Sequence, residues 1–74
     1  MKIYLIQCYT RVFYNVYTSH IIAANNKKEV IELSKKIAAD EGKEIWDTAD
    51  IEIVGDYTGD KKEPHIILSS YIPE

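Results

Sequence analysis

Three side chains of this 74-residue chain could act as a nucleophile or a base: Cys8, His20 and His65. A cysteine beside a histidine can form a catalytic pair, because the imidazole can take the proton of the thiol. Their spacing matches no zinc-binding motif. Cys8 lies in a strand-like stretch, where an unpaired cysteine usually behaves as a small core residue. We therefore expect Cys8 to be buried and His65 to begin a strand, and we predict no catalytic residue, no metal site and no cofactor.

Acidic side chains are the second candidate for chemistry, since paired carboxylates can act as general acid and base. Their neighbours in the sequence are polar, and nothing there would shift a carboxyl pKa. We interpret them as a solvated surface, some of which could instead contact a partner. The pairs are Asp47 with Asp50, Glu52 with Asp56, and Asp60 with Glu63, and the candidate partner contacts among them are Asp47, Asp50, Asp56 and Asp60.

The charges are unevenly placed along the chain. Residues 1–39 carry six basic and two acidic side chains, whereas residues 40–63 carry nine acidic and three basic ones. An acidic half fits a basic protein surface better than a nucleic-acid backbone. The isoelectric point of about 5.3 and the lack of a basic aromatic motif argue against direct nucleic-acid binding. Ordinary solubility charge is the alternative interpretation of the same residues.

The order of apolar and polar residues predicts one α+β domain over residues 1–74, with the element order β-β-α-β-β. Four strands would form a mostly antiparallel sheet, with the helix packed on one face. We expect the first and last strands to be central, because they are apolar on both faces, and the charged third strand to be an edge. Asn26 and Gly42 are the expected N-cap and C-cap of the helix. The expected strands are 2–9, 14–24, 51–57 and 65–72, and the expected helix starts after Asn26 and runs to about Glu41.

The chain is rich in tyrosine, with six in 74 residues, and it has only one helix to cover its sheet. One helix of about 15 residues spans roughly 22 Å and can cover only one sheet face. Tyrosine suits an uncovered face, because its ring offers a large contact area while its hydroxyl tolerates water. We therefore predict that some of the rings line a contact surface on the face away from the helix, and we name Tyr9, Tyr14, Tyr17 and Tyr71 as candidate partner-binding residues. The alternative is that the rings fold inward over small residues and close a small core.

The partner on this surface could be another protein or a second copy of the chain, since two-fold dimers are the commonest oligomer. No stretch is apolar over the roughly 20 residues needed to cross a bilayer, so we expect no membrane partner. A single unpaired cysteine suits a reducing compartment and favours the cytoplasm.

Five segments together resemble a type of small accessory protein encoded by bacteriophages and prophages. These are the opening MKIYLI (1–6), the strand end IIAA (21–24), Trp46, the step IVG (53–55) and the closing IILSSY (66–71). Such proteins are similar in size and charge to inhibitors of bacterial defence, including anti-CRISPR proteins. The resemblance implies a non-catalytic inhibitor that occupies the surface of a host defence complex in the cytoplasm of an infected or lysogenic bacterium. The alternative is a small structural or self-associating phage protein.

Overall fold

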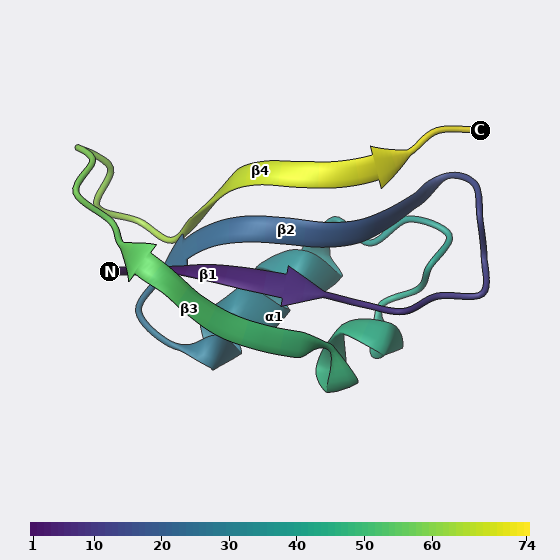
Figure 1. The fold of residues 1–74 in the computed structure, drawn as a ribbon, viewed down its shortest axis with the longest axis horizontal. Helices are drawn as coiled ribbons and strands as arrows, with labels where there is room; N and C mark the ends of the chain where they lie inside the picture. Colours follow the sequence, from purple (N-terminus) through teal and green to yellow (C-terminus); the bar gives the residue numbers. More distant parts are fainter.

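The computed structural model describes all 74 residues as one four-stranded sheet, one α-helix and one short 3₁₀ helix (Figure 1). The strands are all antiparallel and lie in the order β3-β1-β2-β4. This arrangement confirms the predicted α+β fold and its β-β-α-β-β order. The elements are β1 (Lys2–Gln7), β2 (Val16–Ala24), α1 (Lys27–Lys36), the 3₁₀ helix η1 (Glu44–Thr48), β3 (Asp50–Asp56) and β4 (His65–Ile72).

The strand order confirms half of the prediction from apolarity. β1 is central and β3 is an edge, as expected, but β4 is the other edge, and β2 takes the second central position. β2 is the better buried strand because it places small Ala23 and Ala24 and the ring of His20 in the interior. β4 has larger apolar residues but exposes most of them. Apolarity on both faces is therefore not enough to make a strand central, since a central strand must also fit closely between its neighbours.

The helix begins where predicted and ends earlier. The Asn26 side chain accepts a hydrogen bond from the Glu29 N–H at 3.0 Å, and the Glu29 carboxylate accepts one from the Asn25 N–H at 2.7 Å. This is a capping box displaced by one residue. The prediction that the helix reaches Glu41 is wrong: α1 ends at Lys36 with Ile37 as its C-cap. Gly42 has a positive φ of 83°, but it lies in a later turn and not at the helix end. At ten residues, α1 falls well short of the length and apolarity of a membrane-spanning helix.

The core lies between the sheet and one layer formed by α1 and η1. Figure 1 shows α1 behind β1 and β2, and η1 beside the start of β3. Alternate side chains of β1 enter it, as strand periodicity predicts. Val30 from α1 and Trp46 from η1 close it from the other side, and both are fully buried. Trp46 thus anchors the acidic segment that links α1 to β3. The buried cluster consists of Tyr4, Ile6, Cys8, Ile22, Ala24, Val30 and Trp46.

A buried carboxylate fixes the segment that follows the helix. Glu41 was expected to end α1, yet its side chain turns inward and accepts three hydrogen bonds. The donors are the backbone N–H groups of Tyr17 and Ala39, both at 3.1 Å, and the indole N–H of Trp46 at 2.9 Å. The Asp40 N–H also donates to the Asn15 carbonyl at 2.9 Å. These contacts outweigh the local preference of residues 37–41 to continue the helix, because they satisfy donors that burial would otherwise leave unpaired.

We expect Glu41→Ala to lower the free energy of unfolding by about 3 kcal/mol, because it leaves three donors without their charged acceptor. Glu44→Ala is the matched control, since Glu44 is an exposed glutamate three residues away. It should cost only a few tenths of a kcal/mol. Urea unfolding of both variants measures the difference. Equal losses in the two variants would show that the Glu41 contacts do not stabilise the fold.

Candidate functional site

The buried thiol and imidazole do not form a reactive pair. The Cys8 thiol donates to the Tyr17 carbonyl at 3.4 Å, and His20 Nδ1 lies 2.6 Å from the Ser69 hydroxyl. Burial raises the pKa of the Cys8 thiol, and the charge of Glu41 raises it further. Burial also lowers the pKa of His20, against a smaller opposing effect of Glu41. A nucleophilic cysteine needs the opposite shift, toward the thiolate. Cys8 is therefore the buried core residue that the sequence predicted.

The second histidine lies at the start of β4, as predicted. His65 Nδ1 lies 2.8 Å from the Glu63 carbonyl oxygen, and its ring meets the edge of the Tyr57 ring at 5.0 Å between centroids. No group of three potential metal ligands comes together anywhere in the chain. These contacts give His65 a local structural role at the turn into β4.

The four acidic residues named as candidate contacts do not share one surface. Asp47 accepts two hydrogen bonds from Lys35 Nζ, each at 3.0 Å, on the helix side of the molecule. Asp56 is paired with Lys2 at the far end of β3, and the Lys2 ammonium group lowers the pKa of its carboxyl group. Asp60 is exposed in the loop between β3 and β4. Only Asp50, which lies opposite Gln7, is on the sheet face that the helix leaves uncovered.

The tyrosines are distributed differently from the prediction. Tyr17 and Tyr71 lie opposite each other in the β2–β4 pair, with ring centroids 4.8 Å apart, and Tyr17 also packs against His20 on the helix side. The Tyr71 hydroxyl donates to the Asn15 side chain. Tyr17 and Tyr71 therefore do not line the uncovered face: Tyr17 packs against the core, and Tyr71 contacts Tyr17 from the edge strand while staying partly exposed. Tyr9 and Tyr14 are exposed, and both lie in the loop between β1 and β2.

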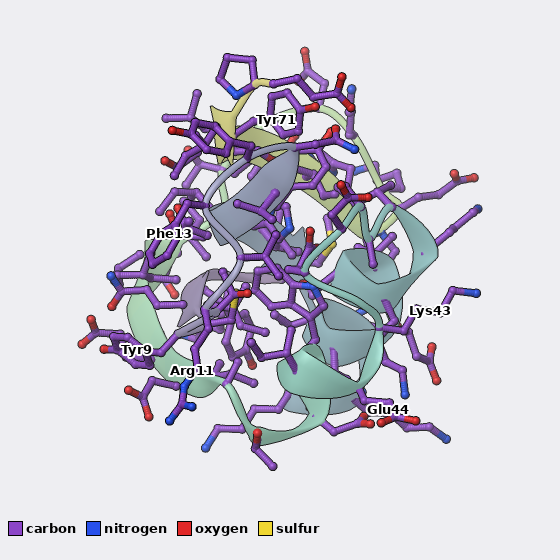
Figure 2. The ribbon with its side chains drawn as sticks, turned by 90° about the vertical axis from the view of Figure 1, so that its right-hand side faces the viewer. Tyr9, Arg11, Phe13, Lys43, Glu44 and Tyr71 are labelled. Atoms are coloured by element: carbon purple, nitrogen blue, oxygen red, sulfur yellow. The ribbon has the colours of Figure 1, made fainter.

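That loop, residues 8–15, carries four exposed apolar side chains, and we call it the aromatic loop. Tyr9, Phe13 and Tyr14 are 77%, 69% and 68% exposed, and Val12 is less so. Figure 2 shows Tyr9 and Phe13 on the side of the molecule away from the helix, with Lys43 and Glu44 on the helix side. Large rings held in water at this density are unusual for a surface that contacts nothing. Phe13 stood in the sequence beside the tyrosines and was missed because only the tyrosines were assigned a role.

The face of the sheet opposite the helix is aliphatic. The strand registers place Ile3, Leu5, Ile21 and Leu68 on this side, and we call these four residues the open face. Leu5 lies opposite Ile21, which in turn lies opposite Leu68, so the three form a row across the middle of the sheet. Leu68 is 66% exposed. A shallow hollow of about 240 Å³ follows this row and is lined by Leu5, Ser19, Ile21, Leu68, Ser69 and Ser70.

The open face has an acidic border on one side. Glu52 lies opposite Leu5, and Asp50 lies opposite Gln7, so both carboxylates belong to the same face as the aliphatic row. A second shallow hollow of about 270 Å³ lies here, between β1 and β3. The other border, β4, carries no charged side chain between Ile66 and Ile72. The open face therefore combines an apolar centre with a negative rim along β3.

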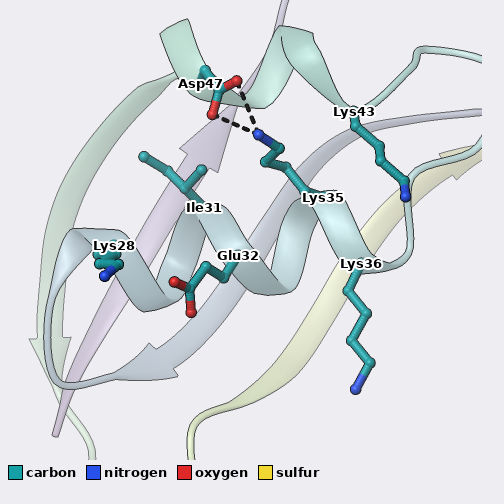
Figure 3. Close-up of a pocket in the computed structure, with 7 residues that line it drawn as sticks. All are labelled: Lys28, Ile31, Glu32, Lys35, Lys36, Lys43 and Asp47. Carbon is teal, nitrogen blue, oxygen red and sulfur yellow. Dashed lines mark hydrogen bonds and ion pairs between the residues drawn. The ribbon is translucent and has the colours of Figure 1, made fainter.

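A larger depression on the helix side has a different character. It has a volume of about 710 Å³ and lies between α1 and η1 (Figure 3). Ile31 is its only apolar residue, and Lys35 is already held by Asp47. Four lysines line this depression, so its surface is mainly polar and basic. The lining residues are Lys28, Ile31, Glu32, Lys35, Lys36, Lys43 and Asp47.

We expect His20 to make stability fall on mild acidification. Its pKa in the folded protein lies below the value in the unfolded chain, about 6.5. The unfolded state therefore binds more protons in the interval between the two values, and stability rises with pH there. The contribution is complete above about pH 6.5 and is lost as the pH falls below that value toward the folded pKa.

The measurement is urea unfolding of the native chain, His20→Gln and His65→Gln between about pH 7.5 and about pH 5. The native chain and His65→Gln should lose stability in parallel across this range. His20→Gln should be less stable at neutral pH but show a flatter dependence. Three parallel curves would contradict the assignment to His20, whose Nε2 is buried and has no hydrogen-bond partner.

Comparison with known proteins adds no relative, since no family model, curated protein or solved structure matches the chain.

Proposed function

We propose that the chain is a non-catalytic binding protein that occupies the surface of a protein partner through the open face and the aromatic loop. The observation that carries this proposal is an aliphatic row that no helix covers, made of half-buried Leu5 and Ile21 and exposed Leu68, with exposed Tyr9 and Phe13 on the same side of the molecule. Apolar side chains gathered at a surface in this way commonly mark an interaction site.

The residue types in the aromatic loop support a protein partner. Tyrosine and arginine are enriched among the residues that contribute most to binding energy, and phenylalanine is enriched in interface cores. The loop holds Tyr9, Arg11, Phe13 and Tyr14 within six positions and contains no acidic residue. Burying one such ring against a partner removes a large apolar area from water at little cost in side-chain entropy.

Charge indicates the chemistry of the partner surface. Asp50 and Glu52 border the open face along β3, and neither forms an ion pair within the chain. A partner that covers the aliphatic row would bring its own side chains against these carboxylates. Basic groups at that border would be attracted and acidic ones repelled. We therefore assign the partner an apolar contact flanked by lysine or arginine.

The resemblance to phage accessory proteins supplies a class for this partner. A host defence complex that handles nucleic acid carries basic surfaces, and a small acidic protein can occupy them by charge complementarity. In this proposal the chain is an anti-CRISPR-like inhibitor that acts in the bacterial cytoplasm and binds its target stoichiometrically. A structural phage protein that only self-associates is the competing assignment, and it needs no host partner.

The test starts with affinity capture from bacterial lysate, followed by titration of the captured complex with purified chain. We expect inhibition to be complete near one equivalent of chain per target, whereas a catalyst would act at far smaller amounts. Phe13→Ser should weaken binding about tenfold or more, as truncation of a central interface ring does. Glu52→Lys should weaken it by reversing the charge of the rim.

Two matched variants control for general surface effects. Ile53→Ser removes an exposed apolar side chain that lies opposite Tyr4, on the helix side of β3. Glu44→Lys reverses an exposed charge that Figure 2 places on the helix side. Both should bind as the native chain does. Loss of binding in these controls, with normal binding by Phe13→Ser, would move the site to the helix side and contradict the proposal.

A further inference from the structure

The outer edge of β4 is a free strand edge. β4 pairs with β2 on one side only, because it ends the strand order β3-β1-β2-β4. The backbone N–H and C=O groups along a free edge can pair with another strand, and natural proteins normally protect such edges with charge, proline or a bulge. The two edges of this sheet differ in how far they carry such protection.

β3 is well protected against pairing. It carries three carboxylates in seven residues, Asp50, Glu52 and Asp56. Its pairing with β1 skips Val54, which is the extra residue of a bulge. If two β3 strands paired antiparallel about Ile53, Asp50 would face Asp56 of the second copy, and like charges opposite each other are destabilising. This edge therefore discourages self-association.

β4 has little protection of this kind. From Leu68 to Ile72 the strand contains no charge and no proline. Its one bulge lies earlier, at Ile67, which the β2–β4 register skips between Ile66 and Leu68. Four of the ten large exposed apolar side chains of the whole chain are in this strand: Ile67, Leu68, Tyr71 and Ile72. The five residues 68–72 thus form a neutral and partly apolar free edge without a bulge of its own, and the bulge at Thr18 lies on the β2 side of the β2–β4 pairing.

The same five residues are complementary to themselves when antiparallel. Pairing centred on Ser70 places Leu68 opposite Ile72 of a second copy, Ser69 opposite Tyr71, and Ser70 opposite Ser70. Each apolar residue of the outer pair thus meets another apolar residue on the same face, and two hydroxyl groups meet at the centre. Cross-strand pairs of these kinds stabilise antiparallel sheets.

We propose that β4 pairs with β4 of a second copy about a two-fold axis at Ser70, which joins two sheets into one of eight strands. Charge favours this occupant, because the order β3-β1-β2-β4 leaves the two acidic β3 strands at the far ends of the joined sheet. The chain carries a net charge of −3, so an arrangement that keeps the acidic strands apart limits repulsion.

The geometry also fixes how the two copies face. Residues directly opposite in an antiparallel pair share a face. Leu68 is on the open face, so Ile72 of the second copy lies on that face too. Within one copy Leu68 and Ile72 share a face, because they are four residues apart in a strand without a bulge between them. The open faces of both copies therefore point the same way, and both helices lie on the other side. The two open faces then form one continuous surface. The dimer does not depend on the proposed partner, but it would present that partner with two equivalent sites.

Sedimentation velocity over a concentration series tests the association. The native chain should shift from 8.5 kDa toward roughly twice that mass as concentration rises. Ser70→Lys should stay monomeric, since it places two ammonium groups at the axis. Ser70→Thr and Thr58→Lys are the controls, one neutral at the same site and one charged in the exposed β3–β4 loop. Both should dimerise as the native chain does, and the thermal melt of each variant shows that it is folded.

Disulfide trapping tests the register, in a Cys8→Ser background that removes the native thiol. Ser70→Cys should cross-link two copies on mild oxidation, because opposite Cα atoms in a sheet are about 4.5–5.5 Å apart, within disulfide reach. Val54→Cys, on the other edge, should not. A native chain that stays monomeric at every concentration overturns the proposal. So does a dimer that survives Ser70→Lys, or an edge that pairs only with an extended peptide from another protein. Phe13→Ser should leave the dimer intact, which separates this result from the partner-binding experiment.

Discussion

One short helix must cover a sheet that is apolar on both faces. This limit decides which apolar side chains remain at the surface of the molecule. α1 has ten residues, so it is about 15 Å long and cannot shield four strands even on its own side. η1 extends the cover by placing Trp46 beside the helix, over the core. No helix covers the opposite side. β1, β2 and β4 contribute apolar residues to both faces of the sheet, but the helices cover only one. The other face therefore carries Leu5, Ile21 and Leu68.

The position of η1 over the core depends on a buried charged side chain, the carboxylate of Glu41. Glu41 links the start of β2 at Tyr17 to the indole of Trp46, so a single carboxylate connects the sheet to the 3₁₀ helix. A buried carboxylate is costly unless its oxygens are satisfied, and three donors satisfy this one. The same charge lies close enough to Cys8 and His20 to act on their pKa values. Cys8 and His20, which are candidates for catalysis in the sequence, thus lie near a carboxylate that has a structural role.

The sequence predicted features that depend on local pattern and missed those that depend on distant contacts. The element order, the Asn26 cap, the alternation along β1 and the edge position of β3 all follow from neighbouring residues. The helix end did not, because Glu41 is drawn inward by donors from β2 and η1. Tyr17 and Tyr71 were misplaced for a different reason. Alternation puts the two rings on one face of the β2–β4 pair, but only the contact of Tyr17 with buried His20 shows that this is the helix side.

The two free edges of the sheet, β3 and β4, suit two different kinds of association. Both faces of a sheet can be buried by another molecule, but only an edge can extend the sheet, and extension requires a strand without charge conflicts. β3 combines an edge with carboxylates that border the open face, so it suits the rim of a contact with a basic surface. β4 combines an edge with a neutral stretch, so it suits pairing with itself. β3 and β4 are the opposite edges of the sheet. A second copy paired with β4 would therefore leave the acidic rim along β3 accessible, and the two associations are sterically compatible.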